Sequence, residues 1–121
     1  MKTCLIIDDS RMIRRVAARI VKDLGFKTDE AENGQDALEK CIVEMPDVVL
    51  LDWNMPVMDG FAFLKALRKE DGGDKPTVLF CTSVRDVSRI MEALSAGADE
   101  YIMKPFDSDI IESKFHLAGL I

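Results

Sequence analysis

The segment Val48–Asp52 (VVLLD) decides the fold, because it is an unbroken apolar run that ends in an acid. Apolar and polar residues do not alternate in it, which is typical of a strand covered on both faces of a parallel sheet. Similar runs occur at Cys4–Ile7 and Val78–Cys81. Weaker runs around Phe26–Ala31 and Tyr101–Met103 complete a predicted set of five strands.

The segments after these runs have apolar residues three and four positions apart, which indicates amphipathic helices. The five stripes are Ile13 to Leu24, Ala37 to Met45, Phe61 to Leu67, Val87 to Leu94 and Ile110 to Phe115. Ser10 and Asp107 are candidate N-caps, and Gly25 stands where a glycine commonly ends a helix. Strand and helix therefore alternate five times.

This alternation predicts an α/β protein, because parallel strands need crossover connections, which are right-handed and usually helical. The expected architecture is an open parallel sheet with helices on both faces. In such sheets the ligand site lies outside the carboxyl ends of the strands.

Composition agrees with one globular domain. The chain has 121 residues, of which 48% are hydrophobic and 31% charged. Its 16 basic and 22 acidic residues give a net charge of −6, so we expect neither a nucleic acid nor a membrane surface as partner.

Cysteine usage and hydropathy exclude further classes. The three cysteines, Cys4, Cys41 and Cys81, show no CxxC spacing, so a disulfide scaffold or zinc site is not indicated. Buried thiols in a reducing cytoplasm are expected instead. No apolar run approaches the ~20 residues of a membrane helix, and the acids Asp8 and Asp9 come too early for a signal peptide.

Polar residues follow the strong runs and should meet at one edge of the sheet. They are Asp8 and Asp9 after the first run, Asp52, Thr82 and, after the fifth run, Lys104. Taken singly, each acid could be a loop residue or cap, Thr82 could cap the next helix, and Lys104 could be solvated. Chance rarely places all of them at strand ends, so their joint position favours a shared site.

The chemistry of that set points to phosphoryl transfer. Three close carboxylates repel one another unless a cation joins them, and Mg²⁺ suits an oxygen-only site. An ammonium and a hydroxyl beside the metal can stabilise phosphoryl oxygens. A carboxylate can be the nucleophile and become an acyl phosphate.

The segment Asp52–Gly60 (DWNMPVMDG) resembles the phosphoacceptor loop of bacterial two-component response-regulator receiver domains. Asp8-Asp9, Thr82 and Lys104-Pro105-Phe106 match the other family positions in order. The resemblance covers the chain and implies a single receiver domain over residues 1–121 with no output domain. It also implies a flavodoxin-like (βα)5 three-layer sandwich with a five-stranded parallel sheet in strand order 2-1-3-4-5.

The resemblance assigns roles to individual residues. Asp52 would accept a phosphoryl group from a histidine kinase or a His-containing phosphotransfer protein. Asp9, Asp52 and the backbone carbonyl of Asn54 would bind Mg²⁺, and Asp8 would hold the metal through water.

The resemblance also implies a conformational change on phosphorylation and assigns residues to it. Lys104 would pair with the phosphoryl oxygens, and its bond to Pro105 would be cis. Thr82 would move to the phosphoryl group, and Tyr101 would turn inward as it does so. Without the resemblance, Tyr101 is simply a strand aromatic packed on a helix.

The implied function is a cytoplasmic, non-enzymatic switch, a monomer before phosphorylation, that binds a target such as the flagellar motor switch in chemotaxis or motility. A phosphorelay intermediate or phosphate sink is the alternative within the family. A remoter one is a Mg²⁺-dependent phosphohydrolase with an Asp nucleophile, but such haloacid dehalogenase-type enzymes need an acid where this chain has Asn54. A flavin module would need Ser, Thr and Gly in place of Asp8-Asp9.

Two features depart from the simplest picture of the family. Val84, two residues after Thr82, cannot orient water by hydrogen bonding, which predicts slow self-dephosphorylation unless Asn54 suffices or a phosphatase acts. A basic stripe on the first helix is either a solvated face or a docking surface for the phosphodonor; it comprises Arg11, Arg14, Arg15 and Arg19.

Two single residues complete the expectations. His116 is the only histidine, and nothing beside it suggests a site, so we expect it on the surface. Trp53 follows Asp52 directly, so its fluorescence should report metal and phosphoryl binding.

Overall fold

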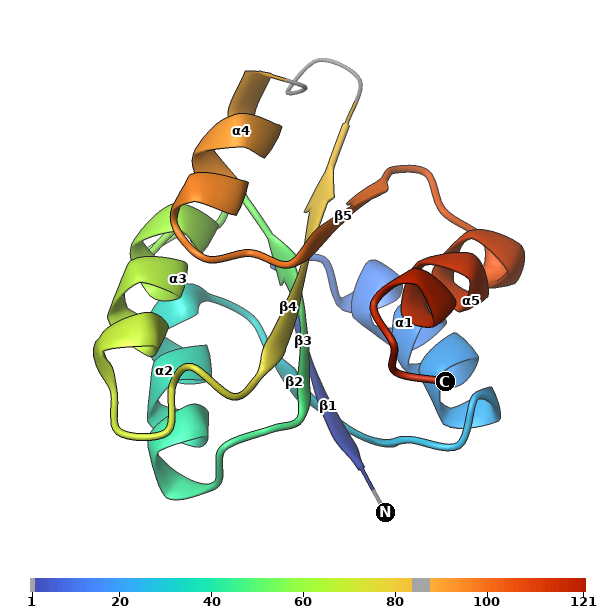
Figure 1. The fold of residues 1–121 in the computed structure, drawn as a ribbon, viewed down its shortest axis with the longest axis horizontal. Coiled ribbons are helices and arrows are strands. Elements are labelled where there is room, and N and C mark those ends of the chain that lie inside the picture. The colour runs from blue at the N-terminus through green and yellow to red at the C-terminus, as the bar shows by residue number, and fades with distance from the viewer. Residues whose placement is uncertain (1, 84–87) are drawn as a thin grey trace.

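The computed structural model describes residues 2–83 and 88–121. Strands and helices alternate along the chain (Figure 1). The strands are β1 (Thr3–Ile7), β2 (Lys27–Ala31), β3 (Val48–Asp52), β4 (Thr77–Thr82) and β5 (Glu100–Met103). The helices are α1 (Arg11–Asp23), α2 (Gly34–Val43), α3 (Gly60–Lys69), α4 (Ser88–Ser95) and α5 (Ser108–Leu117).

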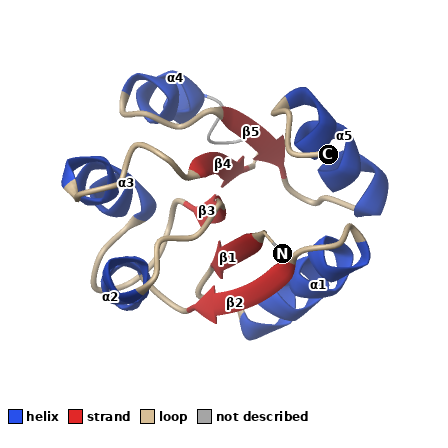
Figure 2. Cartoon of the chain, turned by 60° about the horizontal axis from the view of Figure 1, so that its bottom comes forward, coloured by secondary structure: helices blue, strands red, loops and turns tan. Residues whose placement is uncertain are grey.

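The strands form one parallel sheet in the order β2-β1-β3-β4-β5. Helices α1 and α5 cover one face of the sheet, and α2, α3 and α4 cover the other (Figure 2). The predicted three-layer architecture and strand order 2-1-3-4-5 are confirmed.

Helix ends follow the signals in the sequence. The Ser10 hydroxyl accepts a hydrogen bond from the Ile13 amide at 3.3 Å, and the Asp107 carboxylate accepts one from the Ile110 amide at 2.9 Å. Gly25, with φ +97°, follows the last residue of α1 and its cap, a left-handed conformation that glycine adopts without steric cost. The three predicted caps are therefore confirmed.

Two apolar clusters lie on opposite faces of the sheet, because neighbouring residues of a strand point to opposite faces. One contains Leu51 and Phe63, and the other contains Leu50 and Phe115. Burial of the predicted stripes is incomplete, because each helix has only one face on the sheet. Their exposed members are Val16, Ile42, Met91, Leu94 and Ile110; Val87 lies outside the described residues.

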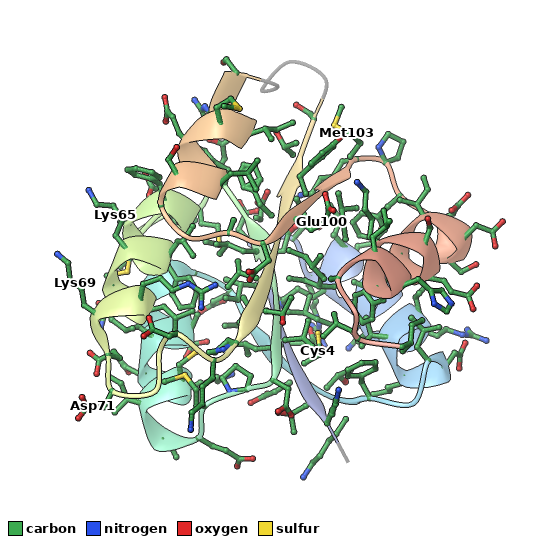
Figure 3. The ribbon with its side chains drawn as sticks, viewed as in Figure 1. Cys4, Lys65, Lys69, Asp71, Glu100 and Met103 are labelled. Carbon is green, nitrogen blue, oxygen red and sulfur yellow. The ribbon has the colours of Figure 1, made fainter. Side chains whose placement is uncertain are left out.

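The three cysteines are free and buried, as expected, and Figure 3 shows Cys4 inside the sandwich. Burial raises the pKa of the Cys41 thiol to about 11 and that of Cys81 to about 12. Burial also raises the pKa of Cys4. His116 is exposed on α5, as predicted. Among the described residues, no helix has both the length and the apolar character needed to cross a bilayer.

Candidate functional site

Three carboxylates meet at the carboxyl edge of the sheet. Strands β1 and β3 pair in parallel with Ile7 opposite Leu51, so the next residues, Asp8 and Asp52, emerge side by side. Together with Asp9 they offer ligand oxygens that all lie within 4.8 Å of one another. Asp8 is only 4% exposed, whereas Asp9 reaches solvent. The predicted convergence of these acids is therefore found.

Lys104 joins two of the acids from the end of β5. Its Nζ donates to Asp8 Oδ2 at 2.8 Å and to Asp52 Oδ1 at 3.0 Å. Its backbone amide donates to the Thr82 carbonyl at 2.6 Å, which ties it to the end of β4. The Lys104–Pro105 bond is cis, as the resemblance implies. The ammonium therefore lies among the acids instead of in solvent.

The electrostatics of this cluster shift two pKa values. Burial alone would lower the pKa of Lys104, but the hydrogen bond to Asp8 and the charge of Asp52 raise it above its ordinary value. Burial raises the pKa of Asp52; Lys104 lowers it in part, and the nearby charge of Asp8 raises it further. The structure thus keeps Lys104 protonated and makes the charged form of Asp52 costly without another cation.

Backbone contacts hold Asp8 in place. Its Oδ1 accepts from the Ser10 amide at 2.9 Å, and its carbonyl accepts from Arg14 Nη1 at 2.7 Å. Arg14 Nε also donates to Glu30 Oε1 at 3.0 Å. Arg14 is therefore partly buried and supports the site, so the predicted basic surface stripe keeps only its exposed members, Arg11, Arg15 and Arg19.

The backbone after Asp52 turns sharply into α3. The Gly60 amide donates to the Trp53 carbonyl at 2.9 Å, and a Cβ on Gly60 would lie 2.2 Å from the Asp52 carbonyl oxygen. Only glycine permits this approach. The Asp59 carboxylate caps α3 by accepting from the Ala62 amide at 2.8 Å.

The tip of this loop is strained. Val57 has φ +70°, which is unusual for a β-branched residue. It is the centre of a three-residue turn in which the Met58 amide donates to the Pro56 carbonyl at 2.7 Å. The Met58 carbonyl in turn accepts from the Gly34 amide at 3.0 Å, so α2 anchors the loop. Strain of this kind is concentrated at functional sites.

Thr82 and Tyr101 lie near the site on neighbouring strands. Thr82 ends β4 and is 3% exposed, and its hydroxyl donates to the Ser83 carbonyl at 3.4 Å. Tyr101 is half-buried on β5, with Lys114 Nζ 3.9 Å from the centre of its ring. Val84 lies outside the described residues.

Arg89, which was not predicted from the sequence to belong to the site, lies in the first turn of α4. Its Nη1 donates to Asn54 Oδ1 at 3.0 Å, and its guanidinium carbon lies 5.4 Å from the centre of the Trp53 ring. Trp53 is buried against Phe61 and Phe80. No motif marks Arg89, because the contact depends on how α4 sits over a loop 35 residues away.

The donor set fits Mg²⁺. The clustered groups are carboxylates only, which are hard oxygen ligands of the kind that Mg²⁺ prefers. The buried ammonium offsets only part of their charge. A divalent cation would therefore complete the charge balance of the site.

Comparison with known proteins agrees with this geometry. The family model of the response regulator receiver domain matches residues 4–116, and the chain belongs to this family. Response regulators of this kind act in two-component signal transduction, so this chain is a response regulator.

Its relatives include chemotaxis proteins. It is 37% identical over 106 residues to the chemotaxis protein CheY of Bacillus subtilis, covering 87% of each chain. It is 37% identical over 110 residues to CheY of Listeria monocytogenes, covering 90% of this chain and 91% of that protein. The chemotaxis response regulator CheY4 of Vibrio cholerae has a similar structure, with a TM-score of 0.91, 30% identity and 98% coverage of both chains.

Proposed function

We propose that Asp52 accepts a phosphoryl group from a histidine kinase or a His-containing phosphotransfer protein, and that this changes how the chain binds a target protein. One observation carries the proposal: Lys104 Nζ lies 2.8 Å from Asp8 and 3.0 Å from Asp52, within a cluster of three carboxylates. An ammonium so placed can neutralise oxygens on a group attached to Asp52.

The metal belongs to the same proposal. Asp9, Asp52 and the backbone carbonyl of Asn54 would hold Mg²⁺ directly, and Asp8 would hold it through water. When bound, the ion neutralises negative charge on the carboxylates and on a phosphoryl group. The hydrogen bonds of Asp8 to Ser10 and Lys104 keep that carboxylate oriented in advance.

The transfer itself needs few protein groups. An Asp52 carboxylate oxygen attacks phosphorus, the phosphorus–nitrogen bond of the donor phosphohistidine breaks, and its electron pair stays on the imidazole. Lys104 stabilises the phosphoryl oxygens through charge, and the Thr82 hydroxyl donates to one of them. The chain then catalyses only its own phosphorylation and dephosphorylation, so it acts as a switch and not as an enzyme with a separate substrate.

The response would spread from Thr82. Its hydroxyl gains a charged acceptor when Asp52 is phosphorylated, and its movement leaves space that Tyr101 fills. A face that includes Tyr101 then changes shape, and a target that prefers the new shape shifts the equilibrium toward it. Because the relatives are chemotaxis proteins, we propose a flagellar motor switch protein as the target.

The composition and the free thiols support proposals about the cellular compartment and the kind of partner. Three free buried cysteines support a reducing compartment, and we propose the cytoplasm. The net charge of −6 supports a protein partner over nucleic acid or membrane. We propose that the unphosphorylated chain is a monomer.

Intact mass measurement tests phosphorylation directly. The protein is incubated with Mg²⁺ and acetyl phosphate, and wild type should gain the mass of one phosphoryl group, whereas Asp52→Ala should gain none. Asp71→Ala is the matched control, since Asp71 is an exposed acid that lies in a turn away from the site (Figure 3). Equal mass gain by Asp52→Ala, or none by wild type, would contradict the proposal.

A further inference from the structure

The charged side chain of Arg89, on α4, contacts two neighbouring residues in the loop that follows β3. Its guanidinium donates to the Asn54 side-chain oxygen at 3.0 Å and lies 5.4 Å from the centre of the Trp53 ring. Trp53 is 9% exposed and is wedged against Phe80 with ring centres 5.0 Å apart. The ring therefore gives the guanidinium a fixed surface to rest on.

The contact determines the orientation of the Asn54 amide. A guanidinium has donors only, so the group that faces it must be the amide oxygen and not the amide nitrogen. The bond is charge-assisted, which makes it stronger than a bond between neutral groups. Asn54 is otherwise exposed, so without Arg89 its amide would be free to turn.

We propose that Arg89 is a positioning residue that slows loss of the phosphoryl group from Asp52 by engaging the Asn54 amide oxygen, which would otherwise be freer to accept from attacking water. The inference rests on the proposed function of Asp52. Asn54 lies two residues beyond Asp52 and is exposed, so water has access to its amide.

The chemistry explains the sign of the effect. In hydrolysis a water oxygen attacks phosphorus, the bond between phosphorus and the Asp52 oxygen breaks, and its electron pair returns to the carboxylate. The water gives up a proton to solvent, so an acceptor that takes a hydrogen bond from that water assists the attack. The Asn54 oxygen is such an acceptor, but the bond to Arg89 fixes its position and takes one of its two lone pairs, so less of its accepting capacity is available to the water. The amide nitrogen can only donate, so it gives no such help.

The decisive test compares decay rates of the phosphoryl group. Wild type, Arg89→Met, Asn54→Ala and the double variant are phosphorylated with acetyl phosphate and Mg²⁺, freed of the donor, and followed by intact mass. Methionine keeps the apolar bulk on Trp53 but removes the donors. We expect Arg89→Met to lose the phosphoryl group about three to ten times faster than wild type, as expected for one released hydrogen bond.

The double variant separates positioning from a general loss of structure. If Arg89 acts through Asn54, Arg89→Met should cause no acceleration when Asn54 is already alanine. Lys65→Met is the matched control, because Lys65 Nζ lies 4.9 Å from the centre of the Phe61 ring on the neighbouring helix α3 and points away from the sandwich (Figure 3). Its phosphoryl group should decay at the wild-type rate.

The possible outcomes distinguish failure of the Arg89 inference from failure of the proposed function. Unchanged or slower decay in Arg89→Met overturns the inference, and so does acceleration that persists in the double variant; in both cases phosphorylation of Asp52 itself stands. A wild-type chain that never gains phosphoryl mass overturns the proposed function, and the inference falls with it.

Discussion

Asp52→Asn should stabilise the protein when no metal is present. The substitution removes one buried negative charge from a cluster of three acids while keeping the size of the side chain. It also leaves Lys104 with a partner, since Nζ still donates to Asp8 at 2.8 Å. No buried cation is therefore left unpaired, which is the usual reason why such a change destabilises a protein.

The magnitude follows from the distances. With an effective dielectric constant near 20, the attraction between Lys104 and Asp52 at 3.0 Å is about 5.5 kcal/mol. Repulsion from Asp8 at 4.8 Å or less is at least about 3.5 kcal/mol on the same scale, and exposed Asp9, screened as in water, adds about 1 kcal/mol. These pair energies nearly cancel, so the cost of removing the carboxylate from water decides the sign.

That cost favours the amide. The Asp52 side chain is 13% exposed, and burial is the largest cause of its raised pKa. We expect Asp52→Asn to raise the free energy of unfolding by about 1–2 kcal/mol, which corresponds to a Tm higher by about 4–8 °C for a domain of this size.

Thermal unfolding in EDTA, recorded across a range of pH, measures the effect. Because the folded pKa of Asp52 lies above its ordinary value of 3.8, the contribution of this group to stability is fully present below pH 3.8 and is lost as the pH rises through the folded value. The Tm difference between variant and wild type should therefore be absent in acid and should increase as the pH rises.

Two results would refute this reasoning. One is a lower Tm for Asp52→Asn at neutral pH in EDTA. The other is an equal rise in Tm for wild type and variant when Mg²⁺ is added, since a ligand of the folded state stabilises in proportion to its affinity and the variant lacks one carboxylate. Asp71→Asn, at an exposed turn acid, controls for the change in net charge and should leave Tm within about 2 °C.

Two further predictions concern backbone packing and the thiols. Gly60→Ala should lower the free energy of unfolding by about 2–3 kcal/mol, because the added Cβ would lie 2.2 Å from the Asp52 carbonyl oxygen; a urea midpoint equal to that of wild type would contradict this. Native Cys41 and Cys81, whose pKa values burial raises to about 11 and about 12, should resist a thiol reagent at pH 8 and react once urea unfolds the chain, since only the thiolate is nucleophilic. Rapid labelling of the folded protein at pH 8 would show that one of them reaches solvent.

The fold could be predicted because its signals are local. The apolar run Val48–Leu51 and the caps at Ser10 and Asp107 each act over a few residues, and parallel pairing then brings the strand ends to one edge. Asp8 and Asp52 meet for the same reason, since register places them on adjacent strands. Such residues can be found by reading where each strand ends.

Contacts that depend on helix placement could not be predicted. Arg14 occurs in a run of arginines that looks like a solvated face, yet its side chain reaches the Asp8 carbonyl and Glu30. Arg89 reaches Asn54 across 35 residues of sequence. Neither position differs in residue type from an ordinary surface arginine, and only the rotation of α1 and α4 about their axes distinguishes them.

The balance of charge explains why such a site can act as a switch. Three carboxylates face one ammonium, so the fold tolerates an excess of negative charge that a stability optimum would remove. In the proposed function, that excess would attract a divalent cation, and the ion would lower the cost of bringing a phosphoryl group to Asp52. Each event would change the charge beside Asp52, so we propose that a neighbour such as Thr82, whose hydroxyl can donate to a phosphoryl oxygen, responds. A site already neutral before the ion arrived would lack this drive, so the buried carboxylate charge whose desolvation makes Asp52→Asn stabilising is the same charge on which the proposed switch depends.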